Sequence, residues 1–82
     1  MKNRDKLKQL LMDIFLLPEK EFRFDLKREE IPTWDSMGTI SMAVGIHETF
    51  NYHFTPAEAM SVTGVADIIR ILEGKGISFH DE

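Results

Sequence analysis

The fold of this chain is decided by residues 33–50, which read TWDSMGTISMAVGIHETF. Asp35 stands directly before a proline-free run, and its carboxylate can accept hydrogen bonds from the unpaired N–H groups of a first helical turn. We therefore predict a helix that begins at Ser36 and continues to about Phe50. Asn51 is the residue predicted to end it.

The apolar face of this predicted helix is wider than a core requires. At 100° per residue it spans about 220° of the helix surface, whereas a surface helix needs an apolar stripe of only about 100–140°. We assign four residues to the core: Met42, Ala43, Ile46 and Phe50. The remaining residues, Met37, Ile40 and Val44, are predicted to form an exposed apolar patch that marks a partner or ligand surface. The alternative is that the preceding loop covers them.

Another helix is predicted near the N-terminus. Its apolar residues follow the spacing i, i+3, i+4, i+7 and i+8 of one buried stripe: Leu7, Leu10, Leu11, Ile14 and Phe15. Leu17 precedes Pro18, which pushes it out of the helical region and ends the helix. Residues 18–35 show no clean period, so we predict an ordered loop pinned by its apolar residues, with Trp34 as a core plug.

Two further helices are predicted after residue 54. Thr55 and Glu58 form a capping box with proline between them, which opens a helix of one or two turns that ends near Ser61. Thr63 is predicted to cap the last helix, and residues 77–82 are predicted to fray. The buried face of that last helix is assigned to Val65, Ile68, Ile69 and Leu72.

This plan predicts an all-α protein. Eighty-two residues suffice for one small domain, so residues 1–82 are expected to form it. We predict a four-helix bundle with a long loop between the first and second helices and a short third helix.

Composition excludes several function classes. The chain has no cysteine, which removes disulfides, zinc–thiolate sites and a cysteine nucleophile. Its net charge of −4 disfavours nucleic acid and favours basic protein partners. No apolar run reaches the roughly 18 residues of a membrane span, and the N-terminus does not read as a signal peptide. We therefore expect no membrane insertion and a cytoplasmic location.

The sequence shows no motif typical of a metal site or a catalytic triad. His47 and His53 are six residues apart, which does not place them on one helical face as i, i+4 ligands would be, so no metal site is predicted. His47 is interpreted as a partly buried residue at the rim of the core. No Gly-x-Ser-x-Gly elbow surrounds Ser36, so no catalytic triad is predicted, and we do not expect an enzyme.

Ser36 lies at the N-terminus of this predicted helix, a position that suits a phosphate group. A helix N-terminus presents unpaired N–H groups and the positive end of the helix dipole, which suit a phosphate. An Asp-Ser pair at a helix start is, by itself, usually no more than a cap.

The segment from Asp35 to Ile40 resembles the Asp-Ser-Leu motif of acyl carrier proteins. Its setting agrees with that family, because a helix and a long loop precede the motif and the motif opens the second helix. Phe50 resembles the family's aromatic residue at the end of that helix, and residues 60–65 resemble the link between its third and fourth helices. The resemblance covers roughly residues 5–73.

The resemblance implies a carrier function. A phosphopantetheinyl transferase would link 4′-phosphopantetheine from coenzyme A to the Ser36 hydroxyl, with Asp35 capping the helix and presenting the serine. Acyl groups would travel as thioesters on this arm to acyl-transferring, ligase or synthase enzymes of fatty-acid, polyketide or other specialised biosynthesis. The carrier is expected to be free-standing and monomeric, and an acyl chain could be sheltered between its helices. The predicted docking face comprises Met37, Ile40, Val44 and Glu48.

Two features depart from the family pattern. From Ser36 to Phe54 the chain has a single acid, Glu48, and no lysine or arginine, whereas many fatty-acid carriers have several acids there. Trp34 replaces the small residue often found before Asp-Ser, as in specialised carriers of secondary metabolism or surface polymers. Two alternatives therefore stay open: an aminoacyl carrier, and a carrier-like interaction module without the arm.

Overall fold

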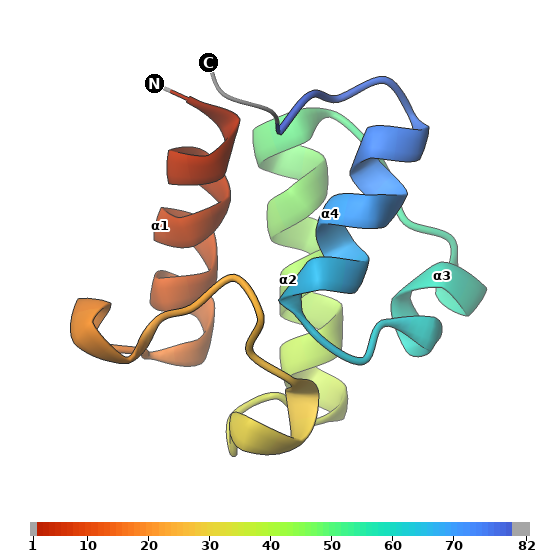
Figure 1. The fold of residues 1–82 in the computed structure, drawn as a ribbon. Coiled ribbons are helices and arrows are strands. Elements are labelled where there is room, and N and C mark those ends of the chain that lie inside the picture. The colour runs from red at the N-terminus through yellow and green to blue at the C-terminus, as the bar shows by residue number, and fades with distance from the viewer. Residues whose placement is uncertain (1, 80–82) are drawn as a thin grey trace.

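The structure, a computed structural model, describes residues 2–79 of the chain. Four α-helices account for most of it, and no strand occurs among the described residues. The helices are α1 (Asn3–Phe15), α2 (Ser36–Phe50), α3 (Pro56–Ser61) and α4 (Val65–Gly74). Both α1 and α3 pack against α2, and α4 runs in nearly the same direction as α2, whereas α1 runs in the opposite direction (Figure 1). The all-α prediction is confirmed for these residues.

The N-terminal helix buries the predicted stripe. Leu7, Leu11 and Phe15 are buried, and Leu10 and Ile14, the other two residues of the stripe, are partly buried against the core. The helix ends at Phe15, earlier than the Leu17-Pro18 boundary that the sequence suggested, because Leu16 adopts a left-handed conformation with φ 57°. The N–H groups of Leu16 and Leu17 then both donate to the Met12 carbonyl, which closes the helix end.

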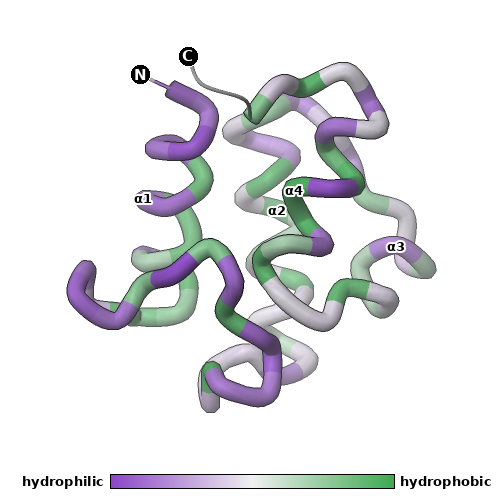
Figure 2. Tube along the Cα trace, viewed as in Figure 1, coloured by the Kyte–Doolittle hydropathy of each residue, from purple (hydrophilic) through white to green (hydrophobic). Residues whose placement is uncertain are grey.

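The core joins all four helices and the long loop. Figure 2 shows hydrophilic residues along the outer side of α1 and the loop that follows it, and more apolar residues in α2 and α4. No helix among the described residues is long and apolar enough to span a bilayer. The buried apolar side chains are Leu7, Leu11, Phe15, Leu26, Ile31, Trp34, Met42, Ile46, Phe54, Ala59, Val62, Val65, Ile68, Leu72 and Phe79.

The loop between α1 and α2 is anchored by three of its apolar side chains. Leu26, Ile31 and Trp34 are buried in the core. Two short 3-10 turns, Glu19–Glu21 and Arg28–Glu30, give it local backbone hydrogen bonds. The loop therefore contributes to the core rather than covering the outer face of α2.

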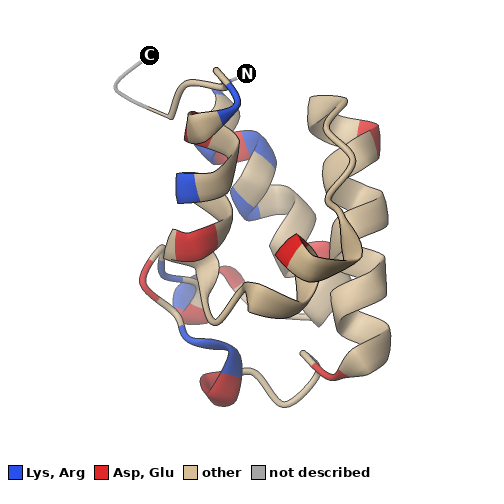
Figure 3. Cartoon of the chain, turned by 90° about the vertical axis from the view of Figure 1, so that its right-hand side faces the viewer, with Lys and Arg blue, Asp and Glu red and all other residues tan. Residues whose placement is uncertain are grey.

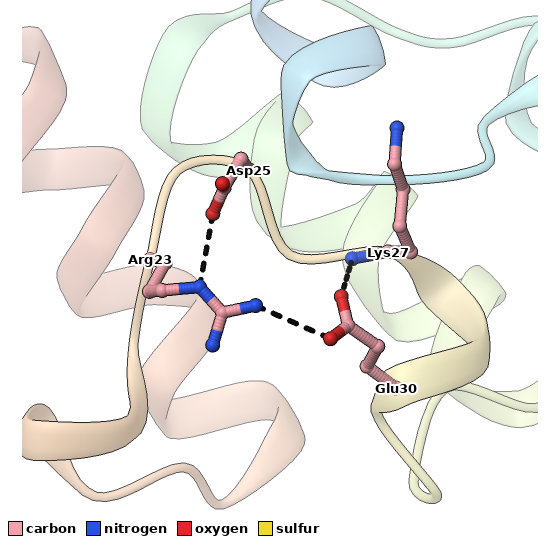
Figure 4. Close-up of polar contacts among 4 residues, drawn as sticks. All are labelled: Arg23, Asp25, Lys27 and Glu30. Atoms are coloured by element: carbon pink, nitrogen blue, oxygen red, sulfur yellow. Dashed lines mark hydrogen bonds and ion pairs between the residues drawn. The ribbon is translucent and has the colours of Figure 1, made fainter.

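Polar contacts fasten the middle of this loop (Figure 4). Arg23 forms ion pairs with Asp25 at 3.0 Å and with Glu30 at 3.2 Å. Glu30 also accepts the backbone N–H of Lys27 at 2.9 Å, and this hydrogen bond is the main reason that the pKa of Glu30 lies below its usual value. These groups are exposed, so water screens them and they contribute little stability.

A short backbone bridge ties the loop to the start of α4. Residues Lys27 and Gly64 pair in an antiparallel bridge. The Arg28 N–H donates to the Thr63 carbonyl at 2.8 Å, and the Val65 N–H donates to the Leu26 carbonyl at 2.9 Å. This pairing fixes the loop against α4, although the two segments are far apart in sequence.

The predicted cap of α4 is wrong in its details. The cap residue is Gly64, which has no side chain to accept a hydrogen bond. Thr63 instead donates both its N–H and its O–H to Oδ2 of Asp67, at 2.8 and 2.6 Å. The hydroxyl hydrogen bond, followed by the N–H hydrogen bond, lowers the pKa of Asp67. A carboxylate in the first turn also faces the positive end of the helix dipole.

We expect Asp67→Asn to lower the free energy of unfolding by about 1 kcal/mol at neutral pH, because charge-assisted hydrogen bonds are lost. A carboxyl group with a depressed pKa stabilises the fold above its unfolded pKa, about 3.9, and this contribution is lost as pH falls through the lower folded pKa. Urea unfolding from pH 7 to pH 3 should therefore show the two proteins converging in acid. A difference that stays constant with pH would contradict the assignment.

The predicted fraying of residues 77–82 is wrong for the part that the structure describes. Phe79 is fully buried, and its ring lies 5.6 Å from that of Phe50 between centroids. Its carbonyl accepts Nε–H of Arg4 at 2.7 Å, which ties the tail to the start of α1. Residues 80–82 lie outside the described residues.

Candidate functional site

Ser36 is the first residue of α2, and its side chain is exposed. Asp35 is the cap, as predicted, and its Oδ1 accepts the Gly38 N–H at 2.9 Å. The Asp35 carbonyl accepts the N–H and the O–H of Thr39, at 2.9 and 3.0 Å. No residue within 2–79 forms a hydrogen bond with the Ser36 hydroxyl. The serine is therefore held by its backbone and leaves its hydroxyl free to react.

The residues before Ser36 rest on the end of α1. Trp34 is 4% exposed and stacks on Phe15 with ring centroids 4.8 Å apart, so its prediction as a core plug is confirmed. The Thr33 hydroxyl donates to the Phe15 carbonyl at 2.8 Å. Gly38 lies directly beneath this turn, where an added Cβ would stand 2.5 Å from the Thr33 carbonyl oxygen. The start of α2 is thus fixed by packing as well as by its cap.

An apolar groove begins at Ser36 and runs along α2. Its volume is about 450 Å³. One wall is formed by α2 and the other by α3 and the segment that leads into it. The lining residues are Ser36, Thr39, Ile40, Ala43, Val44, His47, His53, Phe54, Pro56, Ala59 and Met60.

Side chains of α2 form an exposed apolar patch that includes part of the groove wall. Met37, Ile40 and Val44, the three residues predicted to form it, are 70%, 59% and 52% exposed. Met60 of α3 adds to this apolar surface at 67% exposed. The core assignments also hold for Met42 and Ile46, which are fully buried, and in part for Ala43 and Phe50, which are half-buried.

The groove face carries little charge. Between Ser36 and Phe50 the only charged residue is Glu48, which is exposed near the far end of α2. In Figure 3 α2 is mostly tan, whereas α1, α4 and the long loop carry most of the acidic and basic residues. Docking roles for Glu48 and for the apolar patch stay predictions.

The structure brings His47 and His53 together, which the sequence spacing did not indicate. Their ring centroids are 5.1 Å apart, and both line the groove at the end away from Ser36. Asn51 adopts a left-handed conformation with φ 58°, which ends α2 and turns the chain back. His47 is exposed rather than partly buried. No cluster of three or more metal-ligating side chains occurs in residues 2–79.

A capping network positions α3, which is the second wall of the groove. The Glu58 carboxylate accepts the Thr55 N–H at 3.0 Å, and the Thr55 hydroxyl accepts the Glu58 N–H at 3.1 Å, so the predicted capping box is confirmed. Glu58 also accepts the Tyr52 O–H at 2.5 Å. That hydrogen bond is the main cause of a lowered pKa at Glu58 and a raised pKa at Tyr52.

Comparison with family models, with curated proteins and with solved structures finds no match to this chain. The function of this chain is therefore inferred from the site. This site offers an exposed hydroxyl at a helix N-terminus with no hydrogen-bond partner in residues 2–79, an apolar groove that starts at that hydroxyl, and two imidazoles at the groove's other end. Such a site can accept a phosphate ester on the serine and hold an attached chain beside it.

Proposed function

We propose that this chain is an acyl carrier protein that bears 4′-phosphopantetheine on Ser36. The observation that carries the proposal is the position of the Ser36 hydroxyl, which is exposed, without a hydrogen-bond partner in residues 2–79, and at the mouth of an apolar groove. A serine used only to cap a helix would direct its oxygen to a backbone N–H. Here Asp35 performs that task, which leaves Ser36 available for modification.

The proposal includes an acyl-carrier-like four-helix bundle. The order of elements supports it: a long first helix, a long anchored loop, a helix that opens at the modified serine, a short third helix and a fourth helix. In this arrangement α2 presents the serine, and α3 provides the opposite wall of the groove.

The residues at the start of α2 suit a phosphopantetheine group attached to Ser36. A separate transferase would join the Ser36 oxygen to the phosphorus of coenzyme A nearest the pantetheine. The new P–O bond replaces the pyrophosphate P–O bond, adenosine 3′,5′-bisphosphate leaves, and the serine proton passes to a base. The N–H groups at the start of α2 favour the resulting phosphodiester. Bound there, the arm supplies a thiol, which the cysteine-free chain lacks, and this thiol carries acyl groups as thioesters.

The proposed partners are the transferase and the acyl-transferring, ligase or synthase enzymes that load and unload the arm. Because α2 carries one acid and no base, its docking depends on Met37, Ile40 and Val44 more than on charge. Salt screens surface ion pairs, whereas it does not screen apolar contacts. We propose a non-enzymatic, cytoplasmic carrier of specialised biosynthesis.

The test is enzymatic loading followed by intact-mass spectrometry. Incubation with coenzyme A, Mg²⁺ and a broad-specificity phosphopantetheinyl transferase is expected to raise the mass by one phosphopantetheine group. Ser36→Ala is expected to abolish the gain completely. Ser41→Ala is the matched control, because Ser41 is an exposed serine of the same helix that does not line the groove, and it should load as the parent does.

Absence of any gain with several transferases would contradict the proposal. The exposed patch of Met37, Ile40 and Val44 would then favour the second candidate, a carrier-like interaction module without an arm. Loading of Ser36→Ala at another residue would also overturn the assignment.

A further inference from the structure

The pair of histidines at the far end of the groove has no role in the attachment of the arm. His47 belongs to the last turn of α2, and His53 belongs to the segment that leads into α3. Their rings come within 5.1 Å between centroids although neither is required by the core. Each imidazole carries at least one N–H that can donate a hydrogen bond.

The distance between the two ends of the groove is set by α2. His47 lies eleven residues after Ser36, and the helix rises about 1.5 Å per residue, so the two positions are about 16 Å apart. That separation is comparable with the length of an extended phosphopantetheine arm. A chain attached at Ser36 and laid in the groove would therefore bring its free end to the imidazoles.

The chemistry of the groove changes along its length. Its middle is apolar, with Ile40, Ala43 and Val44 on one wall and Phe54 and Met60 among the residues that face them. No lysine, arginine, aspartate or glutamate lines it. The Thr39 hydroxyl already donates to the Asp35 carbonyl. Hydrogen-bond donors for a bound group are thus concentrated at the far end, on His47 and His53.

We propose that His47 and His53 form a binding site for the acyl end of the arm and select a short acyl group that accepts hydrogen bonds. This inference rests on the proposed function. The imidazole N–H groups donate to the thioester carbonyl and to a hydroxyl or carboxylate on the acyl group. Two exposed imidazoles at the end of an otherwise apolar groove suit such a polar terminus better than a methyl group.

The volume of the groove also favours a short cargo. Sites of about 300–1,000 Å³ hold one drug-sized ligand, and the groove has about 450 Å³. The arm itself is a ligand of that size and leaves little room for more. A long saturated chain would continue past the imidazoles into water, which costs about 0.8 kcal/mol for each exposed CH₂.

The test compares two cargoes that differ by one hydroxyl. The protein is loaded at Ser36 from 3-hydroxybutyryl-coenzyme A or from butyryl-coenzyme A, and intact mass confirms each product. NMR then follows the imidazole Cε1–H resonances of His47 and His53. Both resonances are expected to shift on loading, and the shifts should be larger with the 3-hydroxybutyryl group. Equal or larger shifts with the butyryl group would overturn the selection of a polar cargo.

A pair of charge variants tests whether the arm lies in the groove. Val44→Glu places a carboxylate on the groove wall, whereas Ser41→Glu places the same charge on the same helix outside the groove. Both positions are exposed, so both variants should fold. Val44→Glu is expected to abolish the imidazole shifts, and Ser41→Glu to retain them. Retention of the shifts in both variants would contradict the location of the arm.

Replacement of both histidines tests their selectivity directly. In His47→Leu/His53→Leu, the difference between the two cargoes at the Ile40 and Ala43 amide resonances is expected to disappear. A difference that survives would overturn the role of the imidazoles while leaving the carrier function intact. Failure of the arm to attach at all, seen by mass before any NMR, would overturn the proposed function and this inference with it.

Discussion

Phe79→Ala is expected to lower the free energy of unfolding by about 4 kcal/mol, which is in the range for truncation of a fully buried phenylalanine. Phe79 has no exposed surface, and its ring packs near that of Phe50 at the end of α2. Its truncation leaves a cavity between this end of α2 and the tail. Urea denaturation followed by far-UV circular dichroism measures the loss. Because small domains are stable by only about 5–15 kcal/mol, the variant should unfold at a much lower urea concentration.

Phe79→Leu is the control for this prediction. Leucine keeps most of the buried apolar volume, so it should lose about 1 kcal/mol. The Arg4 hydrogen bond is made to the Phe79 carbonyl and is available to both variants. A Phe79→Ala protein that unfolds within 0.5 kcal/mol of the parent, roughly the range of ordinary surface substitutions, would show that the tail does not belong to the core.

The burial of Phe79 illustrates what the sequence could not predict. Residues 77–79 follow the last helix and have no apolar period, so local pattern reasoning expects a frayed end. The contact that orders them joins Arg4 to Phe79, which are 75 positions apart in the chain. Interactions of such sequence separation depend on how the helices pack, and periodicity does not encode that packing.

Helix-capping residues, which act within one turn of the chain, allowed better predictions from the sequence than the long-range contact of the tail did. The helix boundaries at Asp35 and Thr55 depend on a side chain that accepts an N–H three residues later, and both predicted caps occur in the structure. The same rule failed at Thr63. There the Asp67 carboxylate accepts hydrogen bonds from Thr63, and Gly64 takes the cap position. A hydroxyl can donate as well as accept, and the sequence alone does not decide which it does.

The candidate site likewise has one part that the sequence predicted and another part that it did not. The exposure of Met37, Ile40 and Val44 followed from the width of the apolar arc of α2, a property of one helix. The groove, by contrast, needs α3 placed opposite α2, and the approach of His47 and His53 needs the turn at Asn51. A left-handed residue redirects the chain, so a spacing of six residues gave no indication that the rings meet.

Gly38→Ala is expected to destabilise the protein by about 2 kcal/mol, which is opposite in sign to the effect of helix propensity. Alanine is favoured over glycine by about 1 kcal/mol inside a helix. At this position, however, the added Cβ would stand 2.5 Å from the Thr33 carbonyl oxygen and 3.1 Å from the Phe15 ring. Backbone cannot rotate aside as a side chain can, so the turn before α2 must shift, and such overpacking costs about 1–3 kcal/mol or more.

Gly45→Ala is the matched control, because it is the same substitution in the same helix. There the added Cβ meets the methyl ends of Leu10 and Ile14, at 2.6 and 3.0 Å, and these can move by a change of rotamer. Gly45→Ala should therefore destabilise the protein less than Gly38→Ala does, by about 1 kcal/mol or more, because the gain in helix propensity offsets part of the cost of repacking these side chains. Urea unfolding of the two variants measures the contrast.

The shifted turn also gives Gly38→Ala a functional consequence. Thr33 lies three residues before Ser36, so its displacement alters how the hydroxyl is presented at the start of α2. Under the proposed function, the transferase should therefore load Gly38→Ala more slowly than Gly45→Ala at a temperature where both are folded. A Gly38→Ala protein that is more stable than the parent would show that propensity dominates and that Thr33 does not constrain the helix start. Equal loading rates would show instead that the transferase tolerates the shifted turn.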